Sequence, residues 1–401
     1  MKGRARTGLI GAGFVGRVHL ENLMRSGCAE VAALVSAPAD LIQARRVAAQ
    51  YGIAEVETDY RRVLKDGSID AVHICTPNSL HAAIARDALE AGKHVLCEKP
   101  LATYPEEARK LAALASSKSL RNCTCYNLRY YPLVQQMRQM CAHGDLGDIL
   151  TVQGSYCQDW LLLETDWNWR LDSRENGPSR TMADIGSHWC DMAEFITGLR
   201  ITELCADLQT FHSTRKQPTR PIETFAGKAP NPDDYREVPV DTEDFGACVF
   251  RMGERTRGCF TASQVSAGRK NRLVIEVYGS RMGVAWDGEN PNELWIGHRN
   301  SPNQCLIKDP SLLSPPAAAC STLPGGHAEG YGDTFRHLFS NFYQAIEDPA
   351  LKASYPQFSE GVRQLEIVSA ELESWRSRAW TKVSSDTGLD AHAKTGLAKS
   401  N

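Results

Sequence analysis

The chain has 401 residues, and its 45 lysine and arginine residues against 48 aspartate and glutamate residues leave a formal net charge of −3. Charged residues make up 23% and hydrophobic residues 42%, which is typical of a globular protein long enough for two or three domains. This balance argues against a dedicated nucleic-acid or anionic-membrane binder, and no segment approaches the roughly 20 apolar residues of a membrane-spanning helix.

The N-terminus and the cysteines predict a cytoplasmic protein. Residues 8–15 are too short and too rich in glycine for a signal peptide, so we assign them to the first strand and the turn after it. The thirteen cysteines are odd in number, are spread along the chain and form no CxxC pair. We therefore expect reduced structural thiols rather than disulfides.

The first 126 residues alternate between short apolar runs and helical spacing. The predicted strands are 6–11, 30–35, 71–75, 94–97 and 122–126, and the predicted helices are 15–26, 39–51, 59–64, 80–91 and 104–117. Strands that alternate with helices in this way indicate right-handed βαβ units and a doubly wound parallel sheet. The sequence therefore predicts an α/β fold that begins with a Rossmann dinucleotide-binding domain over residues 1–126.

After residue 131 strands dominate. The helices predicted here are 133–142, 186–196, 332–347 and 359–378, and the strands are 149–156, 202–210, 245–251, 255–263, 273–278 and 283–286. A polar stretch covers residues 212–244. Many strands with few helices between them predict an α/β domain over residues 127–383 with a large open, mainly antiparallel sheet. Residues 384–401 have little hydrophobic content, which predicts a flexible tail.

A glycine motif marks the first strand–helix junction. Gly11, Gly13 and Gly16 form G-x-G-x-x-G with Phe14 and Val15 inside it. The string alone is weak evidence, but at this position the glycines permit a tight turn, a close approach of pyrophosphate and close helix–strand packing. The first turn of the helix then offers free N–H groups to phosphate. We assign these five residues to cofactor binding.

The end of the second strand leaves the choice of dinucleotide open. A carboxylate usually stands there to bind the ribose, but this strand ends at Ser36, and Glu30 and Asp40 only flank it. Ser36 can hydrogen-bond to a ribose hydroxyl or to a 2′-phosphate, and the arginines of the next helix fit a solvated face better than a phosphate site. The sequence predicts NAD or NADP, with a slight preference for NAD.

Polar residues follow the next two predicted strands, at the edge where parallel strands hold their ligands. Thr76, Pro77 and Asn78 follow one strand, with His81 in the next helix, and Glu98, Lys99 and Pro100 follow the other. Proline after Lys99 keeps that lysine extended. We assign these residues, Pro100 apart, to the nicotinamide side of the site, although Thr76 and Asn78 also suit a plain turn and helix cap.

A third motif lies in the second domain. Asp184 is predicted at the cap of the helix over 186–196, with His188 and Asp191 three residues apart on one of its faces. The three interpretations are a catalytic acid and histidine, a structural cap with a buried histidine, and a metal site. The metal site lacks a further cluster of strong ligands, so we predict no metal and assign Asp184 and His188 to catalysis.

In this order and spacing, the glycine motif, Glu98-Lys99-Pro100 and the block from Asp184 to Asp191 resemble the Gfo/Idh/MocA oxidoreductases, the glucose–fructose oxidoreductase and inositol dehydrogenase family. The resemblance covers residues 5 to 375. It implies a Rossmann domain, a second α/β domain whose open sheet mediates dimers or tetramers, and oxidation of a sugar or cyclitol. It also implies that Lys99, Asp184 and His188 occupy the catalytic positions. The segment 178–180 departs from the glycine-rich pattern of many members.

Hydride transfer from an alcohol also requires removal of the hydroxyl proton. His188, with an unperturbed pKa of about 6.5, suits the role of base, and the Lys99 ammonium suits the developing alkoxide, although burial of Lys99 would allow the roles to be exchanged. Indoles and planar polar groups suit the C–H face and hydroxyl edge of a pyranose, although each tryptophan also suits core packing. The further residues assigned to the substrate are Arg129, Tyr131, Gln158, Trp167, Trp169, Arg170 and Tyr331.

Two other functions remain open at this stage. Redox-assisted elimination with a tightly held cofactor would make the protein an NAD-dependent glycosidase or lyase. A protein that binds sugar or dinucleotide without turnover would be a sensor, which the presence of both Lys99 and His188 disfavours. The oxidised sugar, the ring carbon and the direction of reaction are not set by any residue pattern.

Overall fold

A computed structural model of the chain describes residues 4–219 and 234–385. The described residues divide into two compact units: residues 4–125, 338–366 and 384–385 form the first, and residues 126–219, 234–337 and 367–383 form the second. Residues 338–366 thus lie in the first unit, whereas the sequence analysis assigned them to the second domain. Helical periodicity shows that a helix has an apolar face, but it does not show which hydrophobic core that face packs against. The predicted tail lies outside the described residues, except for its first two positions.

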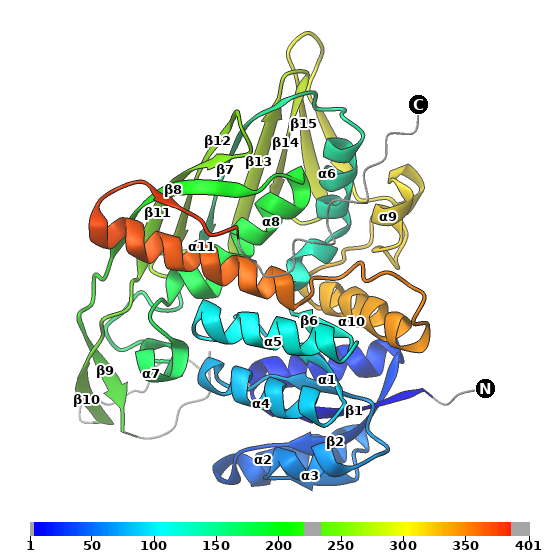
Figure 1. Ribbon diagram of the computed structural model, residues 1–401. Coiled ribbons are helices and arrows are strands. Elements are labelled where there is room, and N and C mark those ends of the chain that lie inside the picture. Colours follow the sequence, from blue (N-terminus) through cyan, green and yellow to red (C-terminus); the bar gives the residue numbers. More distant parts are fainter. Residues whose placement is uncertain (1–3, 220–233, 386–401) are drawn as a thin grey trace. The chain divides into compact units, whose positions relative to one another are not determined.

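The first unit is built on a six-stranded parallel sheet with the strand order β3-β2-β1-β4-β5-β6. Its strands are β1 (Ala5–Ile10), β2 (Ala29–Val35), β3 (Glu55–Glu57), β4 (Ala71–Ile74), β5 (His94–Cys97) and β6 (Asn122–Thr124). The helices between them are α1 (Phe14–Ser26), α2 (Leu41–Tyr51), α3 (Tyr60–Lys65), α4 (Asn78–Glu90) and α5 (Pro105–Ser117) (Figure 1). This is the predicted Rossmann sheet, with one short strand, β3, that the sequence analysis missed.

The central strands of this sheet are mostly apolar because helices cover both faces. All four residues of β4 and the last three of β5 are buried. Phe358, Val362 and Leu365, from the first part of α11 (Phe358–Ser377), join this core. The carboxyl ends of β1, β4 and β5 consequently form a rigid edge that carries the Gly11, Thr76 and Glu98 segments.

The second unit contains a nine-stranded sheet with the order β16-β15-β14-β13-β7-β12-β11-β8-β17. β7 and β12 are parallel and the other neighbouring pairs are antiparallel, so the predicted mainly antiparallel sheet is confirmed. Its strands are β7 (Ile149–Cys157), β8 (Ile201–Gln209), β11 (Phe245–Met252), β12 (Thr256–Ser263), β13 (Arg272–Gly279), β14 (Met282–Asp287), β15 (Glu293–His298), β16 (Gln304–Ile307) and β17 (Thr381–Lys382).

Five strands of this unit were not predicted from the sequence. They are β15 and β16 at one edge of the large sheet, β17 at the other edge, and β9 (Thr214–Pro218) and β10 (Tyr235–Pro239), which pair in a small sheet of their own. The last two lie in the stretch that was predicted only as polar. β9 and β10 have little apolar alternation. They form because each strand satisfies the backbone hydrogen-bonding groups of its neighbour.

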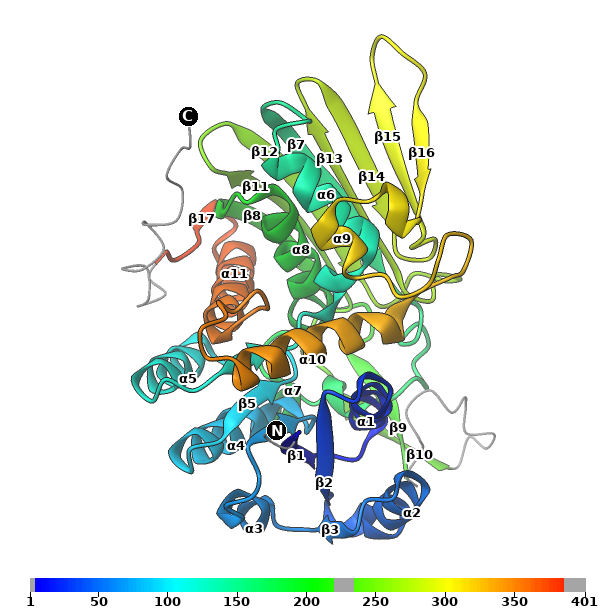
Figure 2. The same ribbon diagram turned by 90° about the vertical axis from the view of Figure 1, so that its right-hand side faces the viewer.

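Helices cover one face of the large sheet, as Figure 2 shows for α6 (Pro132–Ala142) and α8 (Ser187–Thr197). Along β11, Cys248 and Phe250 are buried while Val249 and Arg251 are exposed, which is the alternation of a sheet with one packed face. Trp189 of α8 stacks on Phe260 of β12 with 4.5 Å between the ring centroids. The core of the second unit therefore lies between α8 and this face.

The helix that carries Asp184 begins earlier than predicted. Residues Met182–Gly186 form a π-helical turn that continues directly into α8, and Thr181 before it already has α-helical backbone angles. Asp184 is therefore inside the helix and is not its cap. Glu243, which is distant in sequence, accepts hydrogen bonds from the backbone N–H groups of Arg180 and Met182, each at 2.9 Å. A cap supplied from so far along the chain leaves no local signal.

No helix among the described residues combines the length and the apolar composition needed to cross a bilayer. All thirteen cysteines are free thiols.

Candidate functional site

The glycine turn after β1 has the geometry of a phosphate-binding loop. Gly11 has φ +107°, and a Cβ there would lie 2.5 Å from the carbonyl oxygen of Cys75. A Cβ on Gly16 would lie 1.9 Å from the carbonyl oxygen of Gly11. The two positions therefore require glycine for the turn and for close packing of α1 on the sheet.

Gly13 differs from the other two because a Cβ there would meet no protein atom within 4 Å. Packing within the unit does not require this glycine, so its missing side chain leaves open space above the first turn of α1. Gly13 is also the N-cap of α1 and makes no side-chain cap hydrogen bond. The turn thus fits a dinucleotide: Gly11 to Gly16 would hold the pyrophosphate against N–H groups at the positive end of the helix dipole.

The carboxyl end of β2 carries no acid. Ser36 is buried, and its N–H donates to the carbonyl of Glu57 at 3.0 Å, which attaches the segment to β3. Residue 36 therefore has a fixed backbone.

His81 links the two segments assigned to the nicotinamide side. One ring nitrogen, Nδ1, lies 2.7 Å from the carbonyl oxygen of Pro100, and Nε2 lies 2.9 Å from the carbonyl oxygen of Thr76. Burial lowers the pKa of His81 despite these two carbonyls. A neutral ring donates to only one of them, so His81 holds the shape of this edge while its ring nitrogens face the protein backbone.

Glu98 lies at the end of a buried chain of side chains that crosses the first unit. Its Oε1 is 2.9 Å from His19 Nε2, and His19 Nδ1 is 3.0 Å from His73 Nδ1. His73 Nε2 is in turn 3.0 Å from the hydroxyl of Tyr343 in α10 (Tyr331–Glu347). The other carboxylate oxygen of Glu98 accepts from the backbone N–H of Lys99 at 3.2 Å.

The donor at the carboxylate end of this chain is fixed, because Glu98 can only accept and His19 Nε2 therefore donates to it. Burial holds the pKa of His73 well below its usual value, which agrees with a neutral ring. Burial acts to raise the pKa of Glu98, but the His19 hydrogen bond and charge and the Lys99 charge lower it to about 2. Glu98 is thus a buried carboxylate that fixes the peptide of Lys99.

His19, Glu98 and Cys125 also form a buried group of potential metal ligands, with their ligand atoms within 4.8 Å of one another. The 2.9 Å between His19 Nε2 and Glu98 Oε1 is a hydrogen-bond distance, which leaves no space for an ion between the two atoms. Burial also raises the pKa of Cys125 well above its usual value, which disfavours the thiolate that a metal needs. The cluster as it stands is a hydrogen-bonded core.

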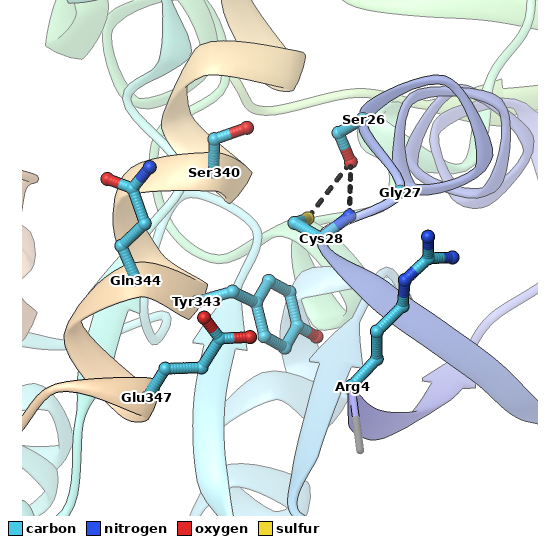
Figure 3. Close-up of a pocket in the computed structure, with 8 residues that line it drawn as sticks. All are labelled: Arg4, Ser26, Gly27, Cys28, Ser340, Tyr343, Gln344 and Glu347. Carbon is cyan, nitrogen blue, oxygen red and sulfur yellow. Dashed lines mark hydrogen bonds between the residues drawn. The ribbon is translucent and has the colours of Figure 1, made fainter. Parts of the chain in front are cut away.

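A cavity of about 300 Å³ lies in the same unit but at the opposite end of β1 from the glycine turn. Figure 3 shows its lining, in which Tyr343 lies near Cys28 and Ser26 bonds to the sulfur of Cys28 at 2.9 Å. Burial raises the pKa of Cys28 to about 11, so this thiol stays protonated. The cavity is on the side where β1 begins, whereas parallel sheets bind their ligands where the strands end. It is therefore separate from the candidate cofactor site.

In the second unit, Asp184 and His188 stand four residues apart across the π-helical turn, which brings them to one side of the helix. The Oδ2 atom of Asp184 accepts from the side-chain amide of Gln264 at 2.9 Å, and Oδ1 lies 3.4 Å from Arg170 Nε. His188 is buried, and the ring of Tyr126 meets it edge-on at 5.5 Å between centroids. Such π-helical turns are frequent at functional sites.

Asp191, the third polar residue of this motif, has a different environment. Arg129 donates to both of its carboxylate oxygens, with 2.7 Å between Nε and Oδ2, and the guanidinium also lies 4.8 Å from the ring centroid of Phe195. The guanidinium of Arg129, which was assigned to the substrate, thus forms a bidentate ion pair with α8.

The structure brings together some of the side chains in the aromatic segment that precedes the Asp184 helix. The Arg170 guanidinium stacks on Trp169 at 4.5 Å while it faces Asp184, so these three side chains form one polar and aromatic wall. Trp167 packs against the small cluster of Leu161, Leu171 and Val240.

The remaining residues assigned to the substrate each lie in a different environment. Gln158 donates to Asn271 at 2.8 Å and accepts from Trp160 at 2.7 Å, so its amide is oriented. Tyr131 is buried against Trp286, with 4.9 Å between their ring centroids. Tyr331 is 39% exposed at the start of α10.

Sequence reasoning missed the residues that support these motifs. They are His19 and His73 behind Glu98, and Thr242, Glu243, Asp244 and Gln264 around the Asp184 helix. One signal was present, because a histidine inside the apolar strand β4 is a polar residue at a core position and requires a partner. Arg180 was noted only as a departure from a glycine-rich pattern.

The strand order of the first unit and its glycine turn define a dinucleotide-binding protein, and the polar motif on the second unit's helix adds a candidate chemical site. Residues 5–126 match the family described as "Oxidoreductase family, NAD-binding Rossmann fold", and residues 134–285 match the GFO/IDH/MocA C-terminal domain. The chain belongs to the Gfo/Idh/MocA oxidoreductase family. It is an enzyme of the nicotinamide-dependent dehydrogenase class, and the resemblance noted from its motifs is confirmed.

Relatives that are named for an activity match nearly the whole chain. A levoglucosan dehydrogenase from Pseudarthrobacter phenanthrenivorans is 28% identical over 94% of this chain and 97% of that protein. The solved structure of a levoglucosan dehydrogenase in complex with NADH and levoglucosan has a TM-score of 0.84 at 26% identity, over 95% of this chain and 100% of that one. An inositol dehydrogenase homologue with NAD⁺ from Azotobacter vinelandii has a TM-score of 0.82 at 28% identity, over 95% and 98% of the two chains.

Proposed function

We propose that the protein is an NAD(P)-dependent dehydrogenase that oxidises a ring CH–OH of a sugar, glycoside, anhydrosugar or inositol. One observation carries this proposal: Asp184 and His188 share a helical turn beside the Trp169 and Arg170 wall. This arrangement pairs a proton acceptor with a group that binds hydroxyls. The levoglucosan dehydrogenase and the inositol dehydrogenase homologue support the substrate class.

The proposed mechanism assigns one role to each motif residue. His188 removes the hydroxyl proton as the carbon is oxidised, since its unperturbed pKa of about 6.5 suits a base at neutral pH. Lys99 stabilises the negative charge that develops on the same oxygen. Asp184 accepts a hydrogen bond from a hydroxyl and orients the ring. The bound nicotinamide supplies the redox chemistry, and the protein supplies alignment and proton removal.

The substrate residues divide by the kind of contact we propose for them. Trp169 and Tyr131 offer flat apolar surface to the C–H face of the ring, and Arg170 and Gln158 offer planar polar groups to its hydroxyl edge. The other residues proposed to line the substrate site are Arg129, Trp167 and Tyr331.

We propose NAD as the preferred dinucleotide. Gly11, Gly13, Phe14, Val15 and Gly16 would hold the pyrophosphate and Ser36 the adenine ribose. Thr76, Pro77, Asn78, Glu98 and Lys99 would line the nicotinamide side, with His81 keeping two of these segments in place. The NADH and NAD⁺ in the related solved structures support this choice. A comparison of kcat/KM for NAD and NADP tests it.

We propose that the protein assembles as a homodimer or homotetramer through the sheet face that α6 and α8 do not cover. Val249 is 47% exposed and Trp295 38% exposed, and the cross-strand partners of Val249 are Cys205 and Cys259. Large apolar side chains on an open face favour a second copy. Light scattering of the wild type and of Val249→Arg tests this proposal, and a monomeric wild type would overturn it.

The free thiols support a reducing compartment, and we propose the cytoplasm. We also propose that catalysis requires no metal. The test is turnover after dialysis against EDTA, where a loss of activity that zinc restores would contradict this part.

The experiment that tests the function is a cofactor-reduction screen over levoglucosan, D-glucose, methyl glucosides and myo-inositol with NAD and with NADP. Net NADH formation from at least one of them, lost in both Lys99→Ala and His188→Ala, is the expected result. Release of a free sugar from a glycoside without net NADH would instead identify a redox-assisted glycosidase. Binding of sugar without any turnover would identify a sensor.

A further inference from the structure

Arg180 lies in a buried polar cluster behind the helix that carries Asp184. Its guanidinium is fully buried and donates to Thr242 Oγ1 at 3.2 Å and to a carboxylate oxygen of Asp244. Arg215 donates to the same oxygen of Asp244 at 2.6 Å. Burial acts to raise the pKa of Asp244, but these two arginines lower it, so the carboxylate is charged. Arg180 is therefore fixed from several sides.

Gln264, just after β12, connects Arg180 to Asp184. Its side chain is buried, with Oε1 2.9 Å from Arg180 Nη1 and Nε2 2.9 Å from Asp184 Oδ2. A guanidinium only donates and a carboxylate only accepts, so this amide has a single allowed orientation. A flipped amide would direct its NH₂ group at Arg180 and its oxygen at Asp184, and both contacts would become repulsive.

This geometry controls the carboxylate of Asp184. Its side chain is only 11% exposed; Gln264 holds Oδ2, and Arg170, on the Oδ1 side, lies at a longer 3.4 Å. The backbone before the helix is fixed as well, because Glu243 accepts from Ser179 Oγ at 2.7 Å and from two backbone N–H groups. Between Gln264 and Arg170, the contact from Gln264 is therefore the shorter and the more buried one.

We infer that Gln264 is a positioning residue for Asp184 and that Arg180 sets the orientation of the Gln264 amide. The pair keeps the carboxylate turned in one direction, so that Asp184 meets a substrate hydroxyl without reorganising. The inference rests on the proposed function of Asp184. It also gives a reason for the departure of residues 178–180 from the glycine-rich pattern, because the arginine at position 180 selects the amide orientation.

The test compares two substitutions of Gln264 in the full-length enzyme, with the sugar that has the highest kcat/KM in the screen above. Gln264→Leu removes the hydrogen bond, and we expect kcat to fall about 10- to 100-fold, as is typical of a hydrogen bond to a charged group. NADH affinity should not change, because the glycine turn belongs to the other unit. Gln217→Leu is the matched control, since Gln217 also accepts from an arginine, Arg236, at 2.7 Å but belongs to the small β9–β10 sheet.

Gln264→Glu gives a readout that a purely structural role would not produce. The new carboxyl still accepts from Arg180, so the buried arginine keeps its partner. When ionised it repels Asp184, and when protonated it donates to Asp184 as the amide does. We therefore expect the activity of this variant relative to wild type to rise as the pH falls from 9 to 6, whereas the relative activity of Gln264→Leu stays constant.

The outcomes separate this inference from the proposed function. If Asp184→Asn keeps full kcat/KM, the role of Asp184 in the proposed function is wrong. If Asp184→Asn loses activity while Gln264→Leu retains it, or Gln264→Glu shows no pH-dependent recovery, the positioning role alone is wrong. A crystal structure of Gln264→Leu with an unchanged Asp184 carboxylate would overturn it without reference to activity. If Gln264→Leu does not fold, the pH profile of Gln264→Glu decides.

Discussion

The two units hold their motif acids in different ways. Glu98 lies at the end of a buried chain through His19, His73 and Tyr343, and its second oxygen is taken by a backbone N–H. Asp184 accepts from the side chain of Gln264 and lies opposite the side chain of Arg170, which is 20% exposed. The first arrangement stabilises a loop, and the second leaves a carboxylate oriented for a ligand. Substitutions in the first unit's chain should therefore affect stability, and those at the second unit's site should affect activity.

The largest expected effect is on the second unit's site. His188→Ala should lower kcat about 10³-fold, because the alcohol then has no base for its proton, while the free energy of unfolding changes little. Steady-state kinetics and urea unfolding of the same preparation measure the two quantities. Near-normal turnover would show that His188 is not the base and would move that role to Lys99.

The next effect concerns the first unit. His19→Leu removes a hydrogen-bond donor to Glu98 and leaves a buried carboxylate that lacks this partner. The free energy of unfolding should therefore fall by about 3 kcal/mol. Denaturant unfolding monitored by circular dichroism measures the change. His143→Leu, at an exposed histidine next to α6, is the control. Equal stability of the two variants would mean that the buried chain does not stabilise the unit.

The same chain predicts a pH dependence of stability. The pKa of Glu98 is lowered to about 2 from an ordinary 4.5, so its contribution is complete above about pH 4.5 and is lost as the pH falls toward 2. Glu98→Gln lacks this titration. The stability difference between wild type and Glu98→Gln should therefore be constant from pH 8 to 5 and shrink below pH 4.5. A difference that grows in acid would contradict the assignment.

The smallest effect concerns the cofactor. Ser36→Asp should restore the missing carboxylate at the end of β2 and reduce kcat/KM for NADP at least about 10-fold, because the new charge repels a 2′-phosphate. Activity with NAD should be retained. Parallel assays with the two dinucleotides measure the effect, and equal losses with both would mean that residue 36 is not at the ribose.

Sequence reasoning succeeded where the signal is local. The strands and helices of the first unit repeat a short apolar period, and the glycines of the first turn are required by the backbone itself, so both are visible in a single segment. It failed for β9, β10 and the start of the Asp184 helix. The two strands are polar and depend on each other. The helix is capped by Glu243, which lies 61 residues from Met182 and 63 from Arg180, and no local pattern reveals such a cap.

The sequence by itself determined the class of protein, because hydrophobic periodicity and the spacing of three motifs are properties of the chain as written. Only the tertiary structure decided how the motif residues are held: which histidine meets Glu98, which amide meets Asp184, and which unit receives residues 338–366. The reason is physical. A buried polar group must find a hydrogen-bond partner, and that partner is selected by proximity after folding rather than by position in the sequence.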